Sequence, residues 1–348
     1  MVLTKNGRLL FNSVPVSDGI VPGTLRYDES EIIDLDAAPL NGGALFKLLA
    51  VSADPFLTAL MSPAYSESAF EHLTYKIGKP IVAYAVIVAL RSEIPTVKPG
   101  DHFMNMFPLE EYFIIDCLPE RTVPLPSDVG IPWSTYVGVC GMPGQTAYMG
   151  WKEYSKAKKG ETAFVTTGAG PVGSFVIQMA KRDGLKVIAS AGSDEKVELM
   201  KSFGADVAFN YKTANTLEIL EREGGIDVFW DNVGGVTLDA ALQASRSKAR
   251  FLECGMMAAY GATDGPNAII KNIWNIVGKS ITMVGFLVWD LYEGHLDDFY
   301  TTVPKLVADG EIKYREDVTR GLGSLEDAMI GLFKGTNVGK AVGIVADE

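Results

Sequence analysis

The sequence predicts an α/β protein in which a doubly wound parallel sheet is joined to an all-β barrel. Its 348 residues are enough for two domains of about 150 residues each. From residue 1 to about 138, short apolar runs alternate with Gly/Pro punctuation, as in Val97-Lys98-Pro99-Gly100-Asp101, which is typical of strands joined by many turns. From about 139 to 311, short β-branched runs alternate with helical segments, which indicates βαβ units and a parallel sheet.

The last stretch begins near Ile312 and contains an expected strand, a helix near 324–333 and a closing strand over 340–345. A segment of this length cannot bury a core alone, so we expect it to pack back onto the N-terminal barrel. The predicted domains are therefore a barrel of residues 1–138 completed by 312–348, and a parallel-sheet domain of residues 139–311.

Six strands are expected in the middle stretch. They are 162–167, 185–190, 206–210, 226–231, 249–254 and 280–285. One helix should follow the first strand and end near Arg182, and another should follow the second strand over 194–203.

Composition and charge exclude several classes of partner. The formal net charge of −12 argues against nucleic acid or an anionic membrane surface as the main partner, although it allows one basic pocket for a small phosphate. The N-terminus lacks the apolar core of a signal peptide, so we expect a cytoplasmic protein. The apolar run Ile81–Leu90 is about half the length that a membrane span requires, and is expected to be a buried barrel strand.

Cysteine and histidine usage gives no sign of a metal site. The sequence has no Cys-x-x-Cys pair, and its three histidines are isolated from other candidate ligands. We therefore expect no zinc. The three cysteines are scattered, and an odd number of them suits free thiols in a reducing compartment. They are Cys117, Cys140 and Cys254.

A glycine-rich run after the first expected strand predicts a dinucleotide site. Residues 168–173 read Gly-Ala-Gly-Pro-Val-Gly, a G-x-G-x-x-G pattern between an apolar strand and a helical segment. Glycines there let the backbone turn and approach a pyrophosphate, whose charge rests on the helix N-terminus. An ordinary Gly-rich turn is the alternative. The expected cofactor contacts are Gly168, Gly170, Pro171, Val172 and Gly173.

The end of the second strand favours NADPH over NADH. An NAD site usually places Asp or Glu about 20 residues past the first glycine, to bind the ribose 2′-hydroxyl. Here the strand end carries small residues and no carboxylate. Ser193 and Lys196 could bind a 2′-phosphate instead. Alternatively Ser193 is a helix N-cap and Lys196 a surface lysine, and both interpretations can hold together.

Several motifs in order resemble the medium-chain dehydrogenase/reductases. More narrowly, they are similar to the zinc-independent alkenal/enone double-bond reductases, which include the leukotriene B4 dehydrogenase/prostaglandin reductases and the plant alkenal reductases. The matching segments are 141–148, 191–196, 209–212, 231–235, 254–256, 285–286 and 335–340.

The resemblance implies a GroES-like barrel joined to a Rossmann domain that binds NADPH, often in a homodimer. It implies that Tyr211 joins Lys196 at the 2′-phosphate. It also implies that Asn232 and the segment 254–260 contact the cofactor, and places a further set around the nicotinamide half. The contacts implied in addition to the glycine run are Asn232, Cys254, Gly255, Tyr260, Phe286, Val288 and Asn337.

The sequence departs from the family in the barrel. Phe56 and Thr58 stand where the family has Tyr and Arg in an Asp-Pro-Tyr-x-Arg segment, and Ala83 and Ala85 stand in a segment that is usually glycine-rich. These changes concern the substrate side, not the cofactor.

The activity implied is reduction of the C=C bond of small apolar α,β-unsaturated aldehydes and ketones, by hydride transfer to the β-carbon. Such a transfer moves negative charge onto an enolate oxygen, which one or two hydrogen bonds can stabilise without a metal. Tyr260, which the resemblance places beside the substrate carbonyl, is the expected catalytic donor, with a role as mere pocket wall as the alternative. A quinone reductase on the same fold, and a non-catalytic NADPH-binding sensor or structural protein, stay open.

Overall fold

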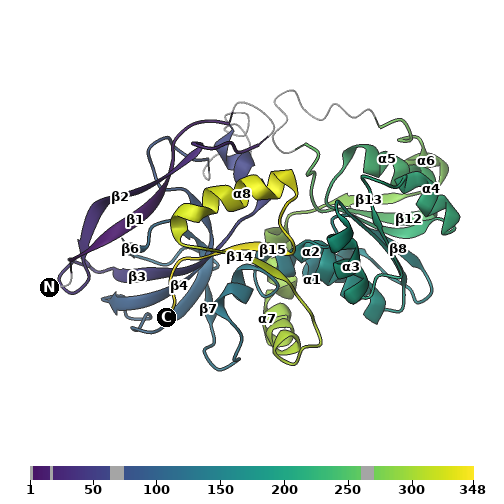
Figure 1. Ribbon diagram of the computed structural model, residues 1–348. Coiled ribbons are helices and arrows are strands. Elements are labelled where there is room, and N and C mark those ends of the chain that lie inside the picture. Colours follow the sequence, from purple (N-terminus) through teal and green to yellow (C-terminus); the bar gives the residue numbers. More distant parts are fainter. Residues whose placement is uncertain (1–2, 16–18, 63–73, 260–269) are drawn as a thin grey trace. The chain divides into compact units, whose positions relative to one another are not determined.

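The computed structural model describes residues 3–15, 19–62, 74–259 and 270–348 (Figure 1). The chain forms two compact units. The first, which we call the barrel unit, comprises Met1–Gly141 and Glu316–Glu348, and the second, the parallel-sheet unit, comprises Met142–Arg315. The junctions expected near residues 138 and 312 lie close to these boundaries.

The barrel unit is built on a seven-stranded sheet. Six strands follow the order β14-β15-β3-β4-β5-β7, and the seventh, β6, also pairs with β3. Pairing is antiparallel except between β14 and β15. The strands are β3 (Ala44–Ser52), β4 (Val82–Ser92), β5 (His102–Pro108), β6 (Tyr112–Ile115), β7 (Val123–Leu125), β14 (Glu316–Arg320) and β15 (Lys340–Ile344). A separate pair contains β1 (Leu3–Phe11) and β2 (Leu25–Asp34). The unit also contains helix α8 (Leu325–Lys334) and the 3-10 helices η1 (Pro55–Met61), η4 (Trp133–Val137) and η6 (Leu322–Ser324).

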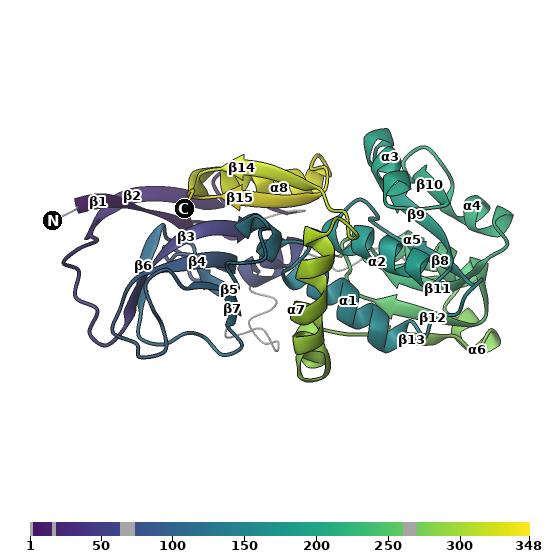
Figure 2. The same cartoon turned by 90° about the horizontal axis from the view of Figure 1, so that it is seen from below.

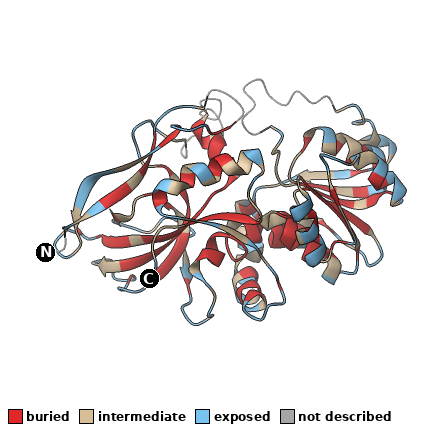
Figure 3. Ribbon diagram, in the orientation of Figure 1, coloured by how far each residue is buried: buried red, intermediate tan, exposed pale blue. Residues whose placement is uncertain are grey.

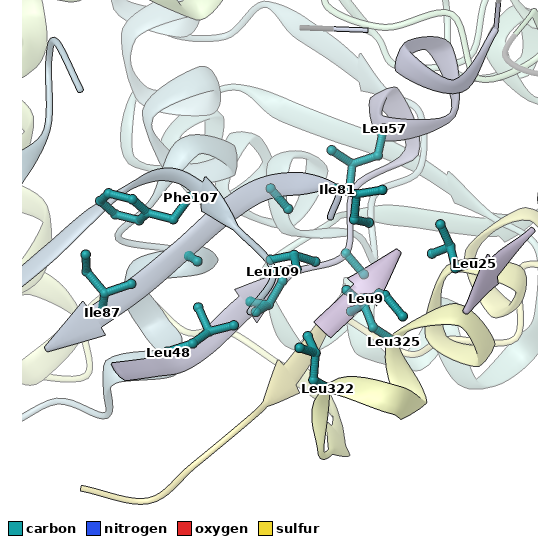
Figure 4. Packing of buried hydrophobic residues seen from close by; sticks show 14 of the residues in the cluster. Leu9, Leu25, Leu48, Leu57, Ile81, Ile87, Phe107, Leu109, Leu322 and Leu325 are labelled. Atoms are coloured by element: carbon teal, nitrogen blue, oxygen red, sulfur yellow. The ribbon is translucent and has the colours of Figure 1, made fainter. Parts of the chain in front are cut away.

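The core of this unit lies between the two sheets and the C-terminal segment. Leu9 is bonded through its backbone to Leu109 and Ile81, which holds β1 against the main sheet. Figure 4 shows these three side chains close to Leu322 and Leu325, which come from the end of the chain. The apolar run expected to be a buried barrel strand forms β4, most of whose side chains are buried.

The parallel-sheet unit contains six parallel strands in the order β10-β9-β8-β11-β12-β13. Figure 2 shows the strand labels in that order. The strands are β8 (Thr162–Val165), β9 (Lys186–Ala191), β10 (Val207–Asn210), β11 (Ile226–Asp231), β12 (Ser245–Glu253) and β13 (Thr282–Gly285). In chain order this is 3-2-1-4-5-6, the Rossmann arrangement.

Helices pack on the sheet and on one another. α1 packs against α2 and α7, and α5 packs against α4 and α6. Their bounds are α1 (Met142–Tyr154), α2 (Pro171–Arg182), α3 (Asp194–Ser202), α4 (Thr216–Arg222), α5 (Gly235–Ala244), α6 (Asn275–Gly278) and α7 (Tyr292–Ala308), and a 3-10 helix, η5 (Val288–Leu291), precedes α7. The central strands β8 and β11 are almost wholly buried, whereas the outer helix faces are exposed (Figure 3).

All six expected strands are present, but β12 begins earlier than expected. It starts at Ser245, where the expectation was 249, and its pairing with β11 shifts between Ile226 and Val228. The early part of β12 is irregular, and Lys248 within it adopts a positive φ of 65°. The exposed polar residues there hide the strand pattern in the sequence.

No helix in the described ranges is long and apolar enough to cross a membrane.

Candidate functional site

The expected cofactor residues of the parallel-sheet unit follow the carboxyl ends of its strands. The glycine run follows β8, Ser193 follows β9, Tyr211 follows β10, Asn232 follows β11 and Cys254 follows β12. Because all strands are parallel, these ends meet at one edge of the sheet, which is where open α/β sheets bind ligands. The structure therefore gathers most of the predicted contacts at one place.

The glycine run turns sharply between β8 and α2, and two of its glycines are required by packing. A Cβ on Gly173 would lie 2.5 Å from Thr167 O and 2.9 Å from Gly168 Cα. A Cβ on Gly168 would lie 2.6 Å from Met200 Sδ. The middle glycine, Gly170, is more open, with Thr167 O at 3.3 Å as its one near neighbour. This leaves backbone at Gly170 that a ligand can approach closely.

Helix α2 begins in a way that suits a phosphate. Gly170 is its N-cap and Pro171 its first residue, and no side chain caps the helix. The first N–H groups of a helix have no partner within it, and the helix dipole favours negative charge there. The start of α2 thus offers backbone donors to an anion without competition from a capping side chain.

At the end of β9, the expected N-cap is present. Ser193 Oγ accepts a hydrogen bond from the backbone N–H of Lys196 at 3.4 Å. Lys196 stands in the first turn of α3 with its side chain partly exposed. The structural role of Ser193 leaves its hydroxyl proton available to an incoming acceptor.

Tyr211 approaches the same strand end from β10. Its N–H donates to Ala191 O at 3.1 Å, and its side chain is half-exposed. A Cβ on Gly192 would lie 3.0 Å from the Tyr211 hydroxyl and 3.2 Å from Lys212 Cε. A larger residue than Gly192 would therefore push both side chains away from the strand end.

Asn232 is held tightly against the end of β8. Its backbone N–H donates to Thr166 Oγ1 and its Nδ2 donates to Thr166 O, both at 2.7 Å. Its Oδ1 accepts from Trp230 Nε1 at 3.1 Å. The side chain is fixed by these bonds, so Asn232 would meet a ligand in a preset orientation.

The segment after β12 is attached to the loop after β11 by its backbone. The N–H groups of Cys254 and Gly255 both donate to Asp231 O, at 2.9 and 3.1 Å. Met257 and Ala258 continue the pairing with Asn232 O and Val233 O. Burial, reinforced by two nearby carboxyls, raises the pKa of the Cys254 thiol. Cys254 therefore acts as a neutral side chain, not as a thiolate nucleophile.

Phe286 and Val288 follow β13. The Phe286 ring packs on the rings of Tyr154 and Trp230, with centroids 5.4 and 5.7 Å away, and a Cβ on Gly150 would lie 2.5 Å from it. The ring thus fills space beside α1. Val288 is buried at the start of η5.

Two expected site residues are not part of the described parallel-sheet unit. Tyr260 lies outside the described residues. Asn337 belongs to the barrel unit, where its Nδ2 donates to Gly339 O at 2.8 Å.

The departures in the barrel unit change what the segment after β3 presents. Thr58 is buried and its hydroxyl donates to Pro55 O at 2.7 Å, so it offers neither the charge nor the reach of an arginine. Phe56 packs edge to face on Tyr84 at 6.3 Å. Nearby, Asp54 forms a buried ion pair with Lys340 at 2.8 Å. This segment is more apolar than the family pattern.

Sequence reasoning gave no individual role to four residues at the sheet edge, although three of them lie in the matched segments 191–196, 209–212 and 231–235. Thr166 and Asp231 organise the loops after β8 and β11, and Gly192 and Lys212 shape the end of β9. Besides those segments, the position of Asp231 at a strand end gave a signal, because a carboxylate there commonly bonds the amides of the following turn.

Among the described residues, no group of three His, Cys, Asp or Glu side chains lies close enough together to hold a metal ion.

Comparison with known proteins gives consistent matches along the chain. The model of the family described as zinc-binding dehydrogenase matches residues 171–308. The chain is 40% identical to the NADP-dependent 2-alkenal reductase of Nicotiana tabacum, over 97% of this chain and 98% of that protein. It is 38% identical to (+)-pulegone reductase of Mentha piperita, over 88% of this chain and 89% of that protein.

Among solved structures, the chain is similar to CurA from Vibrio vulnificus in complex with NADPH. The TM-score is 0.87 with 30% identity, over 98% of this chain and 100% of that chain. The fold class expected from the sequence, a Rossmann sheet with a GroES-like barrel, is confirmed. The chain therefore belongs to the zinc-independent alkenal and enone reductase group of the medium-chain dehydrogenase/reductases.

Proposed function

We propose that this protein reduces the C=C bond of small apolar α,β-unsaturated aldehydes and ketones, with NADPH as the hydride donor. The observation that carries the proposal is the edge of the parallel sheet. There an uncapped helix N-terminus follows a glycine turn, and Tyr211 and Lys212 flank a strand end without a carboxylate, with Lys196 in the first turn of the next helix. The names of the relatives agree, since they are NADP-dependent alkenal and pulegone reductases.

The residues at this edge fit the pyrophosphate and the 2′-phosphate of such a cofactor. The open backbone at Gly170 and the first amides of α2 suit the pyrophosphate. The Tyr211 and Lys212 side chains near Gly192 suit the 2′-phosphate. Ser193 and Lys196 at the start of α3 would add a hydroxyl donor and a second positive charge. β9 itself ends without the carboxylate that an NAD site usually carries to bind the ribose 2′-hydroxyl.

The proposed contacts to the remaining half of the cofactor come from two units. In the parallel-sheet unit they are Asn232, Cys254, Gly255, Phe286 and Val288. Because the Phe286 ring is engaged in packing, we assign its contact to the backbone. Asn337 is the proposed contact from the barrel unit.

When bound, NADPH supplies the hydride. The chain's own residues orient both reactants and stabilise the charge that develops on the substrate oxygen. We assign that role to the Tyr260 hydroxyl, which would donate a hydrogen bond to the carbonyl oxygen as it becomes an enolate. The apolar segment at Phe56 and Thr58 favours substrates without a charged tail, because neither side chain can neutralise one.

One panel of acceptors tests the proposal. NADPH oxidation would be followed with an enone, an enal, a quinone and no acceptor. Turnover with the enone and the enal at rates well above the quinone supports the proposal. A preference for the quinone would make this a quinone reductase on the same fold, which the names of the relatives support less. NADPH binding without turnover of any acceptor would make it a sensor or structural protein.

We also propose a cytoplasmic location, because all three cysteines are free thiols and free thiols suit a reducing compartment. Cell fractionation tests it. The homodimer implied by the family resemblance is a further proposal, and the mass of the native protein in solution is its test.

A further inference from the structure

Two buried carboxyl groups face each other at the carboxyl edge of the sheet. Asp231 is the last residue of β11 and Glu253 the last of β12, and the two are direct partners in the parallel pairing. Asp231 is 0% exposed. Its Oδ2 and both carboxyl oxygens of Glu253 are shielded from solvent, and no donor in the described chain bonds them.

Two adjacent carboxylates cannot both be ionised in such a place. Each buried charge loses its hydration, and the two repel each other. The groups lie within hydrogen-bonding reach of one another, so a single proton between them removes one charge and satisfies an oxygen on each side.

The surroundings decide which carboxyl holds the proton. Asp231 Oδ1 accepts hydrogen bonds from the backbone N–H groups of Val233 and Gly234, at 2.8 and 3.0 Å. Burial raises the pKa of Asp231 as well, but these two backbone donors and the Thr166 hydroxyl favour its ionised form. Glu253 has no such donors, and burial together with Asp231 raises its pKa to about 8. Glu253 therefore carries the proton at neutral pH.

In the described chain, no cation from an element packed on β11 or β12 offsets these charges. β8 and α5 pack against β11, and β11, β13 and α1 pack against β12. β8 carries no titratable side chain, and Asp239 on α5 bonds Asn272. β13 carries no titratable side chain. On α1, Lys152 pairs with Asp298, Glu153 pairs with His295, and the phenols of Tyr148 and Tyr154 are neutral. Asp231 is the one titratable group in the described chain that acts on Glu253, and the neighbouring Cys254 thiol stays protonated.

Asp231 also joins the two loops that flank the proposed nicotinamide site. Its side chain holds the turn at Val233 and Gly234, and its carbonyl oxygen accepts from Cys254 and Gly255. A change in the charge or position of Asp231 would therefore alter the conformation of both loops.

We propose that Glu253 is a positioning residue: its protonated carboxyl donates a hydrogen bond to Asp231, and this bond keeps the loops after β11 and β12 in the arrangement that binds NADPH. The second half of this inference rests on the proposed function. The first half, that the two carboxyls share a proton, does not depend on the proposed function, because it follows from the carboxyl pair alone.

The sign of the pH dependence follows from the raised pKa of Glu253. The unfolded chain releases this proton near the ordinary value of 4.5, whereas the folded protein keeps it to about 8. Between these values the folded state holds more protons, so its stability falls as pH rises. If only the protonated pair binds NADPH, the competent fraction falls from about 0.9 at pH 7 to about 0.1 at pH 9, and the apparent Kd rises about tenfold.

Three variants of the full-length protein test the inference. Glu253→Gln keeps a donor toward Asp231 but cannot ionise. Glu253→Leu removes the donor at similar volume. Glu221→Gln makes the same chemical change at an exposed glutamate on α4 and serves as the control. The measurements are the infrared C=O band of a protonated carboxylic acid, and the Kd for NADPH between pH 7 and pH 9 from fluorescence titration.

We expect the acid band in the wild type at pH 7, its fading through pH 8, and its absence in Glu253→Gln. We expect Kd to rise about tenfold in the wild type and in the Glu221→Gln control, and to stay level in Glu253→Gln. Glu253→Leu should bind NADPH about tenfold more weakly at pH 7.

Absence of the acid band in the wild type at pH 7, or its presence in Glu253→Gln, would overturn the inference that the two carboxyls share a proton. A wild-type pH slope in Glu253→Gln, or wild-type affinity in Glu253→Leu, would overturn the positioning role. If the wild type does not bind NADPH at any pH, the proposed function and the positioning role both fail. The infrared band then still tests whether Asp231 and Glu253 share a proton.

Discussion

Replacing Lys196 with alanine should weaken the preference for NADPH over NADH. Lys196 is in the first turn of α3, and its backbone N–H, not its side chain, is what Ser193 caps. Alanine keeps that N–H and is a good helix former, so the helix should stay intact. The substitution therefore removes a charge with little change to the fold.

The magnitude follows from the contact that is lost. A hydrogen bond to a charged group contributes about 1.5–3 kcal/mol, which corresponds to about ten- to hundredfold in Kd. The Lys196 side chain is partly exposed and Lys212 remains nearby, so the lower end applies. We expect the Kd for NADPH to rise about tenfold in Lys196→Ala, and further when Lys212→Ala is added, with the Kd for NADH nearly unchanged.

The assay is fluorescence titration of each variant with NADPH and NADH at fixed ionic strength. Lys201→Ala is the matched control, because Lys201 lies on the same helix but is exposed and paired with Glu198. It should leave both affinities as they are. Equal weakening of NADPH and NADH by Lys196→Ala would refute the reasoning, since Lys196 would then be structural.

Four further predictions concern separate parts of the account. Tyr260→Phe should lower kcat for enones about tenfold while NADPH affinity changes little, and an unchanged single-turnover rate would make Tyr260 a pocket wall. Exhaustive chelation should leave enone reduction and thermal stability unaltered, whereas stoichiometric zinc lost together with activity would contradict zinc independence. Gly173→Ala should destabilise the fold by about 1–3 kcal/mol in urea unfolding, because its Cβ would meet backbone at 2.5 Å, and a neutral effect would show that the turn can move. Iodoacetamide should label the exposed Cys117 before the buried Cys140, as mass mapping would reveal, and the reverse order would contradict their burial.

Local features of the sheet unit were predictable from sequence because they depend on neighbours in the chain. The glycine turn, the strand before it and the helix after it form one continuous segment, so their spacing indicates their structure. The same holds for the Ser193 cap, which needs only the first turn of α3. In the barrel unit, the C-terminal strand β15 was likewise predictable from its own residues.

The remaining features depend on strand order, which no local pattern contains. Asp231 and Glu253 are 22 positions apart and meet only because β11 and β12 are adjacent. Likewise Gly192 and Tyr211 approach each other because β9 pairs with β10. The irregular start of β12 was missed because exposed polar residues occupy it.

The most direct test of the central claim is the position of the transferred hydride. NADPH carrying deuterium at the reactive carbon of its nicotinamide ring would be turned over with a simple enone, and the product examined by NMR. The account predicts a saturated ketone with deuterium on the former β-carbon. Deuterium on the carbonyl carbon of an allylic alcohol would contradict it, because hydride would then have been added to the C=O bond.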